Sequence, residues 1–164
     1  LRANVDTRMK RLADGQIHAT VLALSGLTRL GLEGHVRSLL DPYAMPPAAG
    51  QGALAITARA DDAAARDLAA RVHAAAAGFE VTVERRFLFG LDGTCHTPIG
   101  AHARLDADGM HFVGEALTAD GKHRWRREGV IANGPGLAER AQGLADRFAA
   151  EIRAEAGPLL PLET

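Results

Sequence analysis

The sequence predicts an α/β region followed by a small α+β domain. In the first region, two continuous apolar runs at residues 19–24 and 53–58 alternate with helical patterns. Such runs are typical of strands that are covered on both faces of an α/β sheet. From about residue 75 onward, the pattern becomes helix, three strands, helix, which describes an α+β domain.

The first predicted helix follows Asn4, a residue type that caps helix N-termini. Val5, Met9 and Leu12 recur at helical spacing, and Gly15 ends the pattern. The run at residues 19–24 then predicts a buried strand. Leucines within residues 27–32 predict a short helix, and the proline-containing residues 41–50 predict an irregular connection.

The second apolar run, at residues 53–58, predicts another buried strand. The acidic pair Asp61 and Asp62 comes next and is well placed to cap an alanine-rich helix that extends to about Ala76, because carboxylates are favourable at helix N-termini. This helix ends the α/β region.

The α+β domain begins with a helix over residues 79–91, in which Val83, Phe87 and Leu91 recur every four residues. Three strands are predicted at residues 99–105, 110–117 and 123–130, separated by Asp-Gly turns, so we expect an antiparallel meander. A last helix follows Gly136. Its apolar stripe consists of Leu137, Ala141, Leu144, Phe148 and Ile152.

Composition excludes several classes of protein. The formal net charge is -1, so the chain as a whole lacks the basic footprint of a nucleic-acid binder. Its longest apolar stretch is too short to cross a bilayer. A single cysteine cannot form an intrachain disulfide, which favours a cytoplasmic location. The seven histidines have no metal-site spacing, so no metal site is expected.

Cys95 lies in a predicted loop between Gly93 and Pro98, where a thiol is more reachable than in the core. A free cysteine is nevertheless often a small buried hydrophobe. The residue types alone leave both interpretations open.

Four segments resemble motifs of the porphobilinogen deaminases, also called hydroxymethylbilane synthases. Residues 1–8 resemble that family's Arg-Gly-Asn-Val-x-Thr-Arg segment, with Ala3 in place of the glycine. Residues 26–31 resemble its Gly-Leu-x-Arg-Leu-Gly, and residues 47–53 its Pro-x-x-Gly-Gln-Gly-Ala. Residues 93–100 are similar to its cofactor loop, with Thr94 before the cysteine. The resemblance covers almost the whole chain.

The resemblance implies an activity and a cofactor. Members of this family condense four porphobilinogen units head to tail into hydroxymethylbilane, release ammonia, and build the product on a covalent dipyrromethane cofactor. Cys95 would carry that cofactor, because a soft thiolate attacks an electrophilic methylene to form a stable thioether. Each pyrrole bears an acetate and a propionate, so the growing chain is a polyanion that needs positioned cations.

The same resemblance implies the residues that bind the cofactor. Arginine pairs with a carboxylate bidentately, and Arg2, Arg8 and Arg29 fall in the matching motifs. Arg29 follows the predicted strand at residues 19–24, at the end where α/β sheets place ligands. Gln51 and Gly52 are the remaining candidates: Gln51 as a hydrogen-bonding group and Gly52 for backbone freedom.

The resemblance also implies a domain plan. Residues 1–45 would be the second half of one periplasmic-binding-protein-like α/β domain, and residues 46–72 would form a hinge and return to another such domain. Residues 75–164 would form the small cofactor-attachment domain. The catalytic aspartate is expected in an N-terminal part that has no counterpart here, so this chain alone is expected to be inactive, and the complete enzyme is expected to be a monomer.

Two other interpretations come from different functional classes. A two-lobed α/β protein can bind a small anion without chemistry, although such binding would not need the Cys95 loop. A thiol-dependent enzyme could use Cys95 as a nucleophile, with His96 or His102 as its base. Alkylation of Cys95 by iodoacetamide would separate the last case from a cysteine already held in a thioether.

Overall fold

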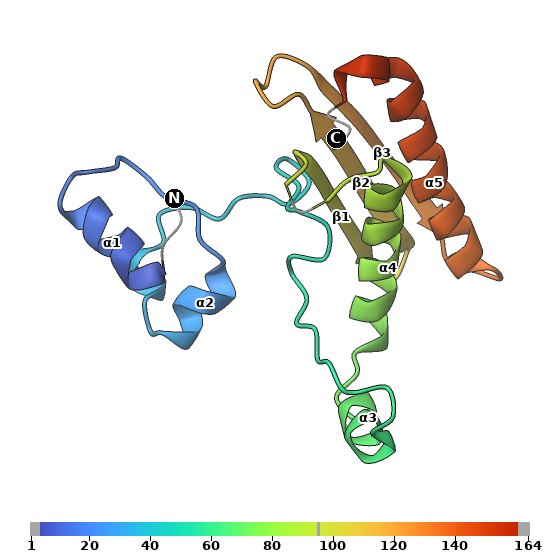
Figure 1. Cartoon of the computed structure of the whole chain (residues 1–164), viewed down its shortest axis with the longest axis horizontal. Helices are drawn as coiled ribbons and strands as arrows, with labels where there is room; N and C mark the ends of the chain where they lie inside the picture. The colour runs from blue at the N-terminus through green and yellow to red at the C-terminus, as the bar shows by residue number, and fades with distance from the viewer. Residues whose placement is uncertain (1–3, 95, 161–164) are drawn as a thin grey trace. The chain divides into compact units, whose positions relative to one another are not determined.

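The computed structural model describes residues 4–94 and 96–160 (Figure 1). The chain divides into two compact units, residues 1–40 and residues 41–164, which we call unit 1 and unit 2. Each unit is described by itself. None of the helices in the described part of the chain is long and apolar enough to cross a membrane.

Unit 1 contains helix α1 (Val5–Ala13), helix α2 (Leu24–Arg29) and the short 3-10 helix η1 (Glu33–His35). The predicted cap is confirmed, because the side-chain oxygen of Asn4 accepts a hydrogen bond of 2.9 Å from the Thr7 amide. Among the described residues of this unit, Leu27 alone has a buried side chain. The two helices therefore enclose very little core.

The strand predicted at residues 19–24 is wrong for this chain. Residues 19–23 are irregular, Leu24 begins α2, and the Val21 side chain is 62% exposed. A strand needs a neighbour for its backbone hydrogen bonds, and the described part of unit 1 supplies none. The apolar run is therefore neither a strand nor buried among the described residues.

The strand predicted at residues 53–58 is wrong for the same reason. This segment of unit 2 is irregular, and the side chains of Leu54 and Ile56 are 89% and 64% exposed. Helix α3 (Ala63–Ala70) follows and is capped by Asp62, whose carboxylate accepts from the Ala65 amide at 2.9 Å. The predicted helix was placed too long at its C-terminus, since residues 71–74 lie between α3 and the next helix.

The rest of unit 2 matches the predicted order of elements. Helix α4 (Ala75–Gly90) precedes strands β1 (Ile99–Leu105), β2 (Gly109–Leu117) and β3 (Arg124–Ala132). The strands form an antiparallel sheet of order β1-β2-β3, as predicted. Helix α5 (Leu137–Ala156) and the short 3-10 helix η2 (Gly157–Leu159) complete the unit. Figure 1 shows α4 and α5 side by side along the sheet.

The core of unit 2 lies between the sheet and these two helices. Phe112 of β2 contacts Phe87 of α4 edge-on at 5.6 Å between ring centroids and stacks on Phe148 of α5 at 6.0 Å. Gly114 allows this approach, because a Cβ at that position would lie 2.6 Å from the Phe87 ring. The predicted stripe of α5 is confirmed, since Ala141, Leu144, Phe148 and Ile152 are all buried.

Candidate functional site

The first part of the candidate site is the turn of residues 92–98, which joins α4 to β1. Asp92 adopts a left-handed conformation with φ of 52°, and the Gly93 amide donates to the Leu88 carbonyl at 3.0 Å. A Cβ on Gly93 would lie 2.5 Å from the Ile99 side chain and 2.6 Å from that of Leu88. A larger residue here would therefore require the Ile99 and Leu88 side chains to shift, with the Leu88 carbonyl oxygen also only 3.2 Å from the added Cβ.

Cys95 itself lies outside the described residues, but the turn is ordered by hydrogen bonds on both sides of it. The Thr94 amide donates to the Thr97 hydroxyl at 3.0 Å, and the His96 amide donates to the Thr94 hydroxyl at 3.2 Å. Thr94 and Thr97 are half-buried and His96 is exposed, so the turn lies at the surface of unit 2.

Arg153 of α5 holds the helix end that precedes this turn. Its Nε and Nη2 atoms donate to the Gly90 carbonyl at 3.1 and 2.6 Å, and its Nη1 atom pairs with the Asp92 carboxylate at 2.7 Å. A guanidinium at a helix C-terminus satisfies carbonyl groups that have no intrahelical partner. This contact was not predicted from the sequence, because it joins residues about sixty positions apart.

The second part of the site is the loop of residues 46–52, which contains the candidates Gln51 and Gly52. The Pro47 carbonyl accepts from the Ala101 amide of β1 at 2.8 Å. Gly50 has φ of 74°, and its amide donates to a Glu84 carboxylate oxygen at 2.7 Å. Gln51 and Gly52 are exposed, and the Gln51 side-chain oxygen accepts from the Ala48 amide at 3.3 Å. In this loop the left-handed glycine is Gly50.

Glu84 of α4 is a buried acid that the sequence analysis missed. Besides Gly50, it accepts from the Ala103 amide of β1 at 2.9 Å. Its side chain lies 3.8 Å from the His102 ring nitrogen Nδ1, and the Tyr43 ring contacts His102 edge-on. Burial raises the pKa of Glu84, and burial lowers the pKa of His102, so each environment disfavours the charged form.

The three predicted arginines belong to unit 1. Arg2 lies outside the described residues. Arg8 lies in α1, as predicted, and its side chain is half-buried; Arg29 is exposed in the last turn of α2. The expectation that Arg29 follows a strand is wrong, because the residues before α2 are irregular. Neither Arg8 nor Arg29 lines the pocket described next.

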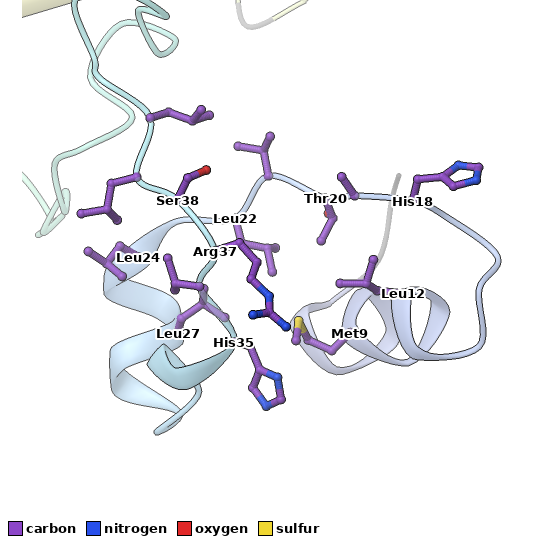
Figure 2. Close-up of a pocket in the computed structure, with 15 residues that line it drawn as sticks. Met9, Leu12, His18, Thr20, Leu22, Leu24, Leu27, His35, Arg37 and Ser38 are labelled. Atoms are coloured by element: carbon purple, nitrogen blue, oxygen red, sulfur yellow. The ribbon is translucent and has the colours of Figure 1, made fainter.

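A pocket of about 660 Å³ opens between α1, α2 and the segments beside them (Figure 2). Met9, Leu12, Leu22, Leu24 and Leu27 contribute to its lining. The sole guanidinium in the lining is that of Arg37, together with the imidazoles of His18 and His35. This pocket therefore resembles an uncovered apolar core more than a site for a ligand with many carboxylates.

Metal binding finds no support among the residues that the structure describes. No group of three or more histidine, aspartate or glutamate side chains is placed there to share an ion.

Comparison with known proteins assigns both halves of the chain. The family model described as "Porphobilinogen deaminase, dipyromethane cofactor binding domain" matches residues 1–67, and the one described as "Porphobilinogen deaminase, C-terminal domain" matches residues 78–154. The two matches thus define consecutive parts of one multidomain protein. The chain belongs to the porphobilinogen deaminase family.

Curated relatives agree with this assignment. A porphobilinogen deaminase of Caulobacter sp. (strain K31) is 48% identical over 99% of this chain and 51% of its own length. That of Caulobacter vibrioides (strain NA1000 / CB15N) is 47% identical over 99% of this chain and 50% of its own length. That of Nitrobacter hamburgensis is 39% identical over 90% of this chain and 48% of its own length. The chain spans about half the length of the curated relatives it matches.

Proposed function

We propose that this chain is part of a porphobilinogen deaminase (hydroxymethylbilane synthase), which joins four porphobilinogen units into hydroxymethylbilane and releases ammonia. The observation that carries this proposal is the match of two consecutive family models, in order, along the chain. The ordered turn of residues 92–98 supports it, because that turn surrounds the single cysteine of the sequence.

The cofactor in this proposal is a dipyrromethane joined to Cys95 by a thioether. When bound, it supplies the primer on which the product is built. The match named for cofactor binding covers residues 1–67, whereas Cys95 falls in the second match, at residues 78–154. The proposal therefore divides the work between the halves: the C-terminal part anchors the cofactor and the preceding part binds its carboxylates.

Arg2, Arg8 and Arg29 are proposed to bind those carboxylates, with Gln51 and Gly52 beside the cofactor. All five fall within the match that is named for cofactor binding. Bidentate arginine–carboxylate pairs fix the position of a carboxylate as well as neutralising it. In unit 1 the Arg29 side chain is exposed, so it is accessible to a ligand.

The proposal includes the part of the relatives that this chain does not span. The exposed Leu54 and Ile56 side chains and the apolar pocket of unit 1 support burial against further sequence. We place the catalytic aspartate there, assign residues 1–45 and 46–72 to two periplasmic-binding-protein-like domains, and expect this chain alone to lack activity. We also propose that the complete enzyme is a cytoplasmic monomer that binds no nucleic acid.

The test replaces Cys95 with serine in the full-length enzyme. The hydroxyl preserves the size of the side chain but removes the soft nucleophile. Wild type and Cys95→Ser are produced in a host that makes porphobilinogen, and their intact masses and aldehyde colour reactions are compared. We expect the dipyrromethane mass in the wild type alone. A serine variant that still carries this mass would show that the cofactor is anchored elsewhere.

A second test addresses the arginines. Replacing Arg8 or Arg29 with leucine in the full-length enzyme should impair cofactor assembly or chain elongation, at about 2 to 5 kcal/mol for a lost carboxylate contact in a desolvated site. Cofactor mass, turnover and unfolding midpoint are measured together. Normal turnover and full cofactor occupancy in both variants would show that these arginines are solvated surface residues that do not bind the cofactor.

A further inference from the structure

Strand β1 lies at one edge of the sheet, yet its outward-facing amides are paired. The Ala101 amide donates to the Pro47 carbonyl at 2.8 Å. The Ala103 amide donates to Glu84 Oε1 at 2.9 Å, and the Leu105 amide donates to Glu80 Oε1 at 2.9 Å. Helix α4 therefore supplies two carboxylates, one turn apart, that replace part of a neighbouring strand.

The two glutamates differ in burial and in their partners. Glu80 is half-buried, and its carboxylate accepts from the Leu105 amide of β1. Glu84 is buried, and its second oxygen, Oε2, also accepts from the Gly50 amide at 2.7 Å. A single carboxylate thus joins the loop of residues 46–52 to the strand that begins four residues after Cys95.

The loop is shaped to reach this carboxylate. Gly50 has φ of 74°, a conformation that favours glycine and turns its amide toward Glu84. The other end of the loop is Pro46, which lies close to Gly100 of β1. A Cβ on Gly100 would lie 2.6 Å from the Pro46 carbonyl oxygen, so the loop and β1 are in close backbone contact. One hydrogen bond and one close backbone contact therefore join the loop directly to β1, and the Gly50 amide joins it to Glu84 of α4.

Burial raises the pKa of Glu84, against the two backbone hydrogen bonds that favour its ionised form. A buried carboxylate is weak evidence for stability, and this one joins two backbone segments, so the geometry that it imposes is the feature to explain.

We propose that Glu84 is a positioning residue that couples the Gln51 loop (residues 46–52) to β1, so that Gln51 and β1 keep a fixed separation during chain elongation. The expected effect on catalysis rests on the proposed function. The coupling itself rests only on contacts within unit 2. Glu84 acts through the loop and the strand and is not assigned any contact with substrate.

The experiment compares Glu84→Gln with Glu80→Gln in the full-length enzyme. Both changes remove one carboxylate from α4, but an amide at position 84 can accept from one backbone amide and must present its NH₂ group to the other. Amide hydrogen exchange is measured over residues 46–52 and 101–105. We expect Glu84→Gln to speed exchange at Gly50 by about 10- to 100-fold, and Glu80→Gln to leave residues 46–52 unchanged.

Turnover is measured on the same proteins. We expect Glu84→Gln to lower kcat by about ten-fold with the cofactor mass retained and KM little changed, whereas Glu80→Gln stays close to the wild type. Unchanged exchange over residues 46–52 in Glu84→Gln would overturn the proposal, and so would equal losses of kcat in the two variants.

Two further controls keep these outcomes distinct. If Glu84→Gln does not fold, Glu84→Asp takes its place, because the shorter acid keeps the charge but cannot span both amides; faster exchange at Gly50 is again expected. If the wild-type enzyme carries no cofactor and makes no hydroxymethylbilane, the proposed function fails, and the exchange measurement still decides whether Glu84 couples the loop to β1.

Discussion

The two units of the chain differ in how much core their own residues enclose. Among the described residues of unit 1, the buried side chain is that of Leu27, and an apolar pocket opens beside it. Unit 2 buries three aromatic rings between a complete sheet and two helices. Apolar residues occur in both units, so composition does not explain the difference.

The difference in core size is explained better by how far apart in the sequence the packing partners lie. Each strand of unit 2 pairs with the strand next to it in the chain, and α4 and α5 flank the sheet in sequence as well as in space. The apolar runs at residues 19–24 and 53–58 have no such neighbour among the described residues. Unit 2 encloses a core because its strands pair with strands next to them in the sequence. Unit 1 encloses little core because its apolar run has no such partner among the described residues.

The largest expected effect contrasts the two units directly. Phe112→Ala removes a ring that is fully buried in unit 2, so it should lower the free energy of unfolding by about 3 to 5 kcal/mol. Leu27→Ala in unit 1 should leave this transition unchanged, because Leu27 is not part of that core. Urea unfolding of the 164-residue chain, followed by Trp125 fluorescence, measures both. A matching loss in Leu27→Ala would show that the units unfold together.

The next effect concerns two glycines within unit 2. Gly93→Ala forces a methyl group against Ile99 and Leu88 and should destabilise the unit by about 1 to 3 kcal/mol. Gly143→Ala in α5 has open space around it and should stabilise the helix by about 0.5 to 1 kcal/mol. Thermal unfolding midpoints should therefore move in opposite directions; a shift in the same direction would contradict the tight closure at Gly93.

A smaller effect is expected at Arg153. Replacing it with leucine removes the bonds to the Gly90 carbonyl and the pair with Asp92, and we expect a loss of about 1 kcal/mol because the side chain is partly exposed. Amide exchange over residues 90–94 should rise. Arg147→Leu, on the exposed side of the same helix, is the control, and equal exchange in both variants would refute the role of Arg153.

The smallest effect is a change in titration in the turn between β2 and β3. The Thr118 hydroxyl, followed by Lys122, lowers the pKa of Asp120 to about 2. This contribution to stability is present above the ordinary pKa of 3.8 and is lost as the pH falls toward 2. In Thr118→Ala the pKa should return toward 3.8, and in Thr118→Ser it should stay low. Carboxyl chemical shifts across this pH range measure both, and an unchanged pKa in the alanine variant would exclude the hydroxyl as the cause.

The sequence predicted local features of the fold well. The Asn4 and Asp62 caps, the three strands and the stripe of α5 are confirmed, because each depends on residues close together in the chain. The strands predicted at residues 19–24 and 53–58 were wrong, since an apolar run does not show whether a partner is available to pair with it and cover it.

The candidate site was predicted less completely. Motif resemblance indicated the loop of residues 46–52 and the turn around Cys95, but neither Glu84 nor Arg153 was identified. Both act across long sequence separations, and a glutamate within a helix is indistinguishable by pattern from a solvated one. The roles of Arg2, Arg8, Arg29 and Gln51 stay predictions.

The exposed segment of residues 53–58 has a consequence for aggregation. Its six residues carry no charge, no proline and no glycine; Ile56 and Thr57 favour strands, whereas its three alanines do not. Arg59 and Asp61 follow at once and act as charged gatekeepers on one side, whereas the preceding side has none nearby. With Leu54 and Ile56 exposed, this segment is a site at which copies of the chain can associate through β pairing, and any contact that covers it removes that site.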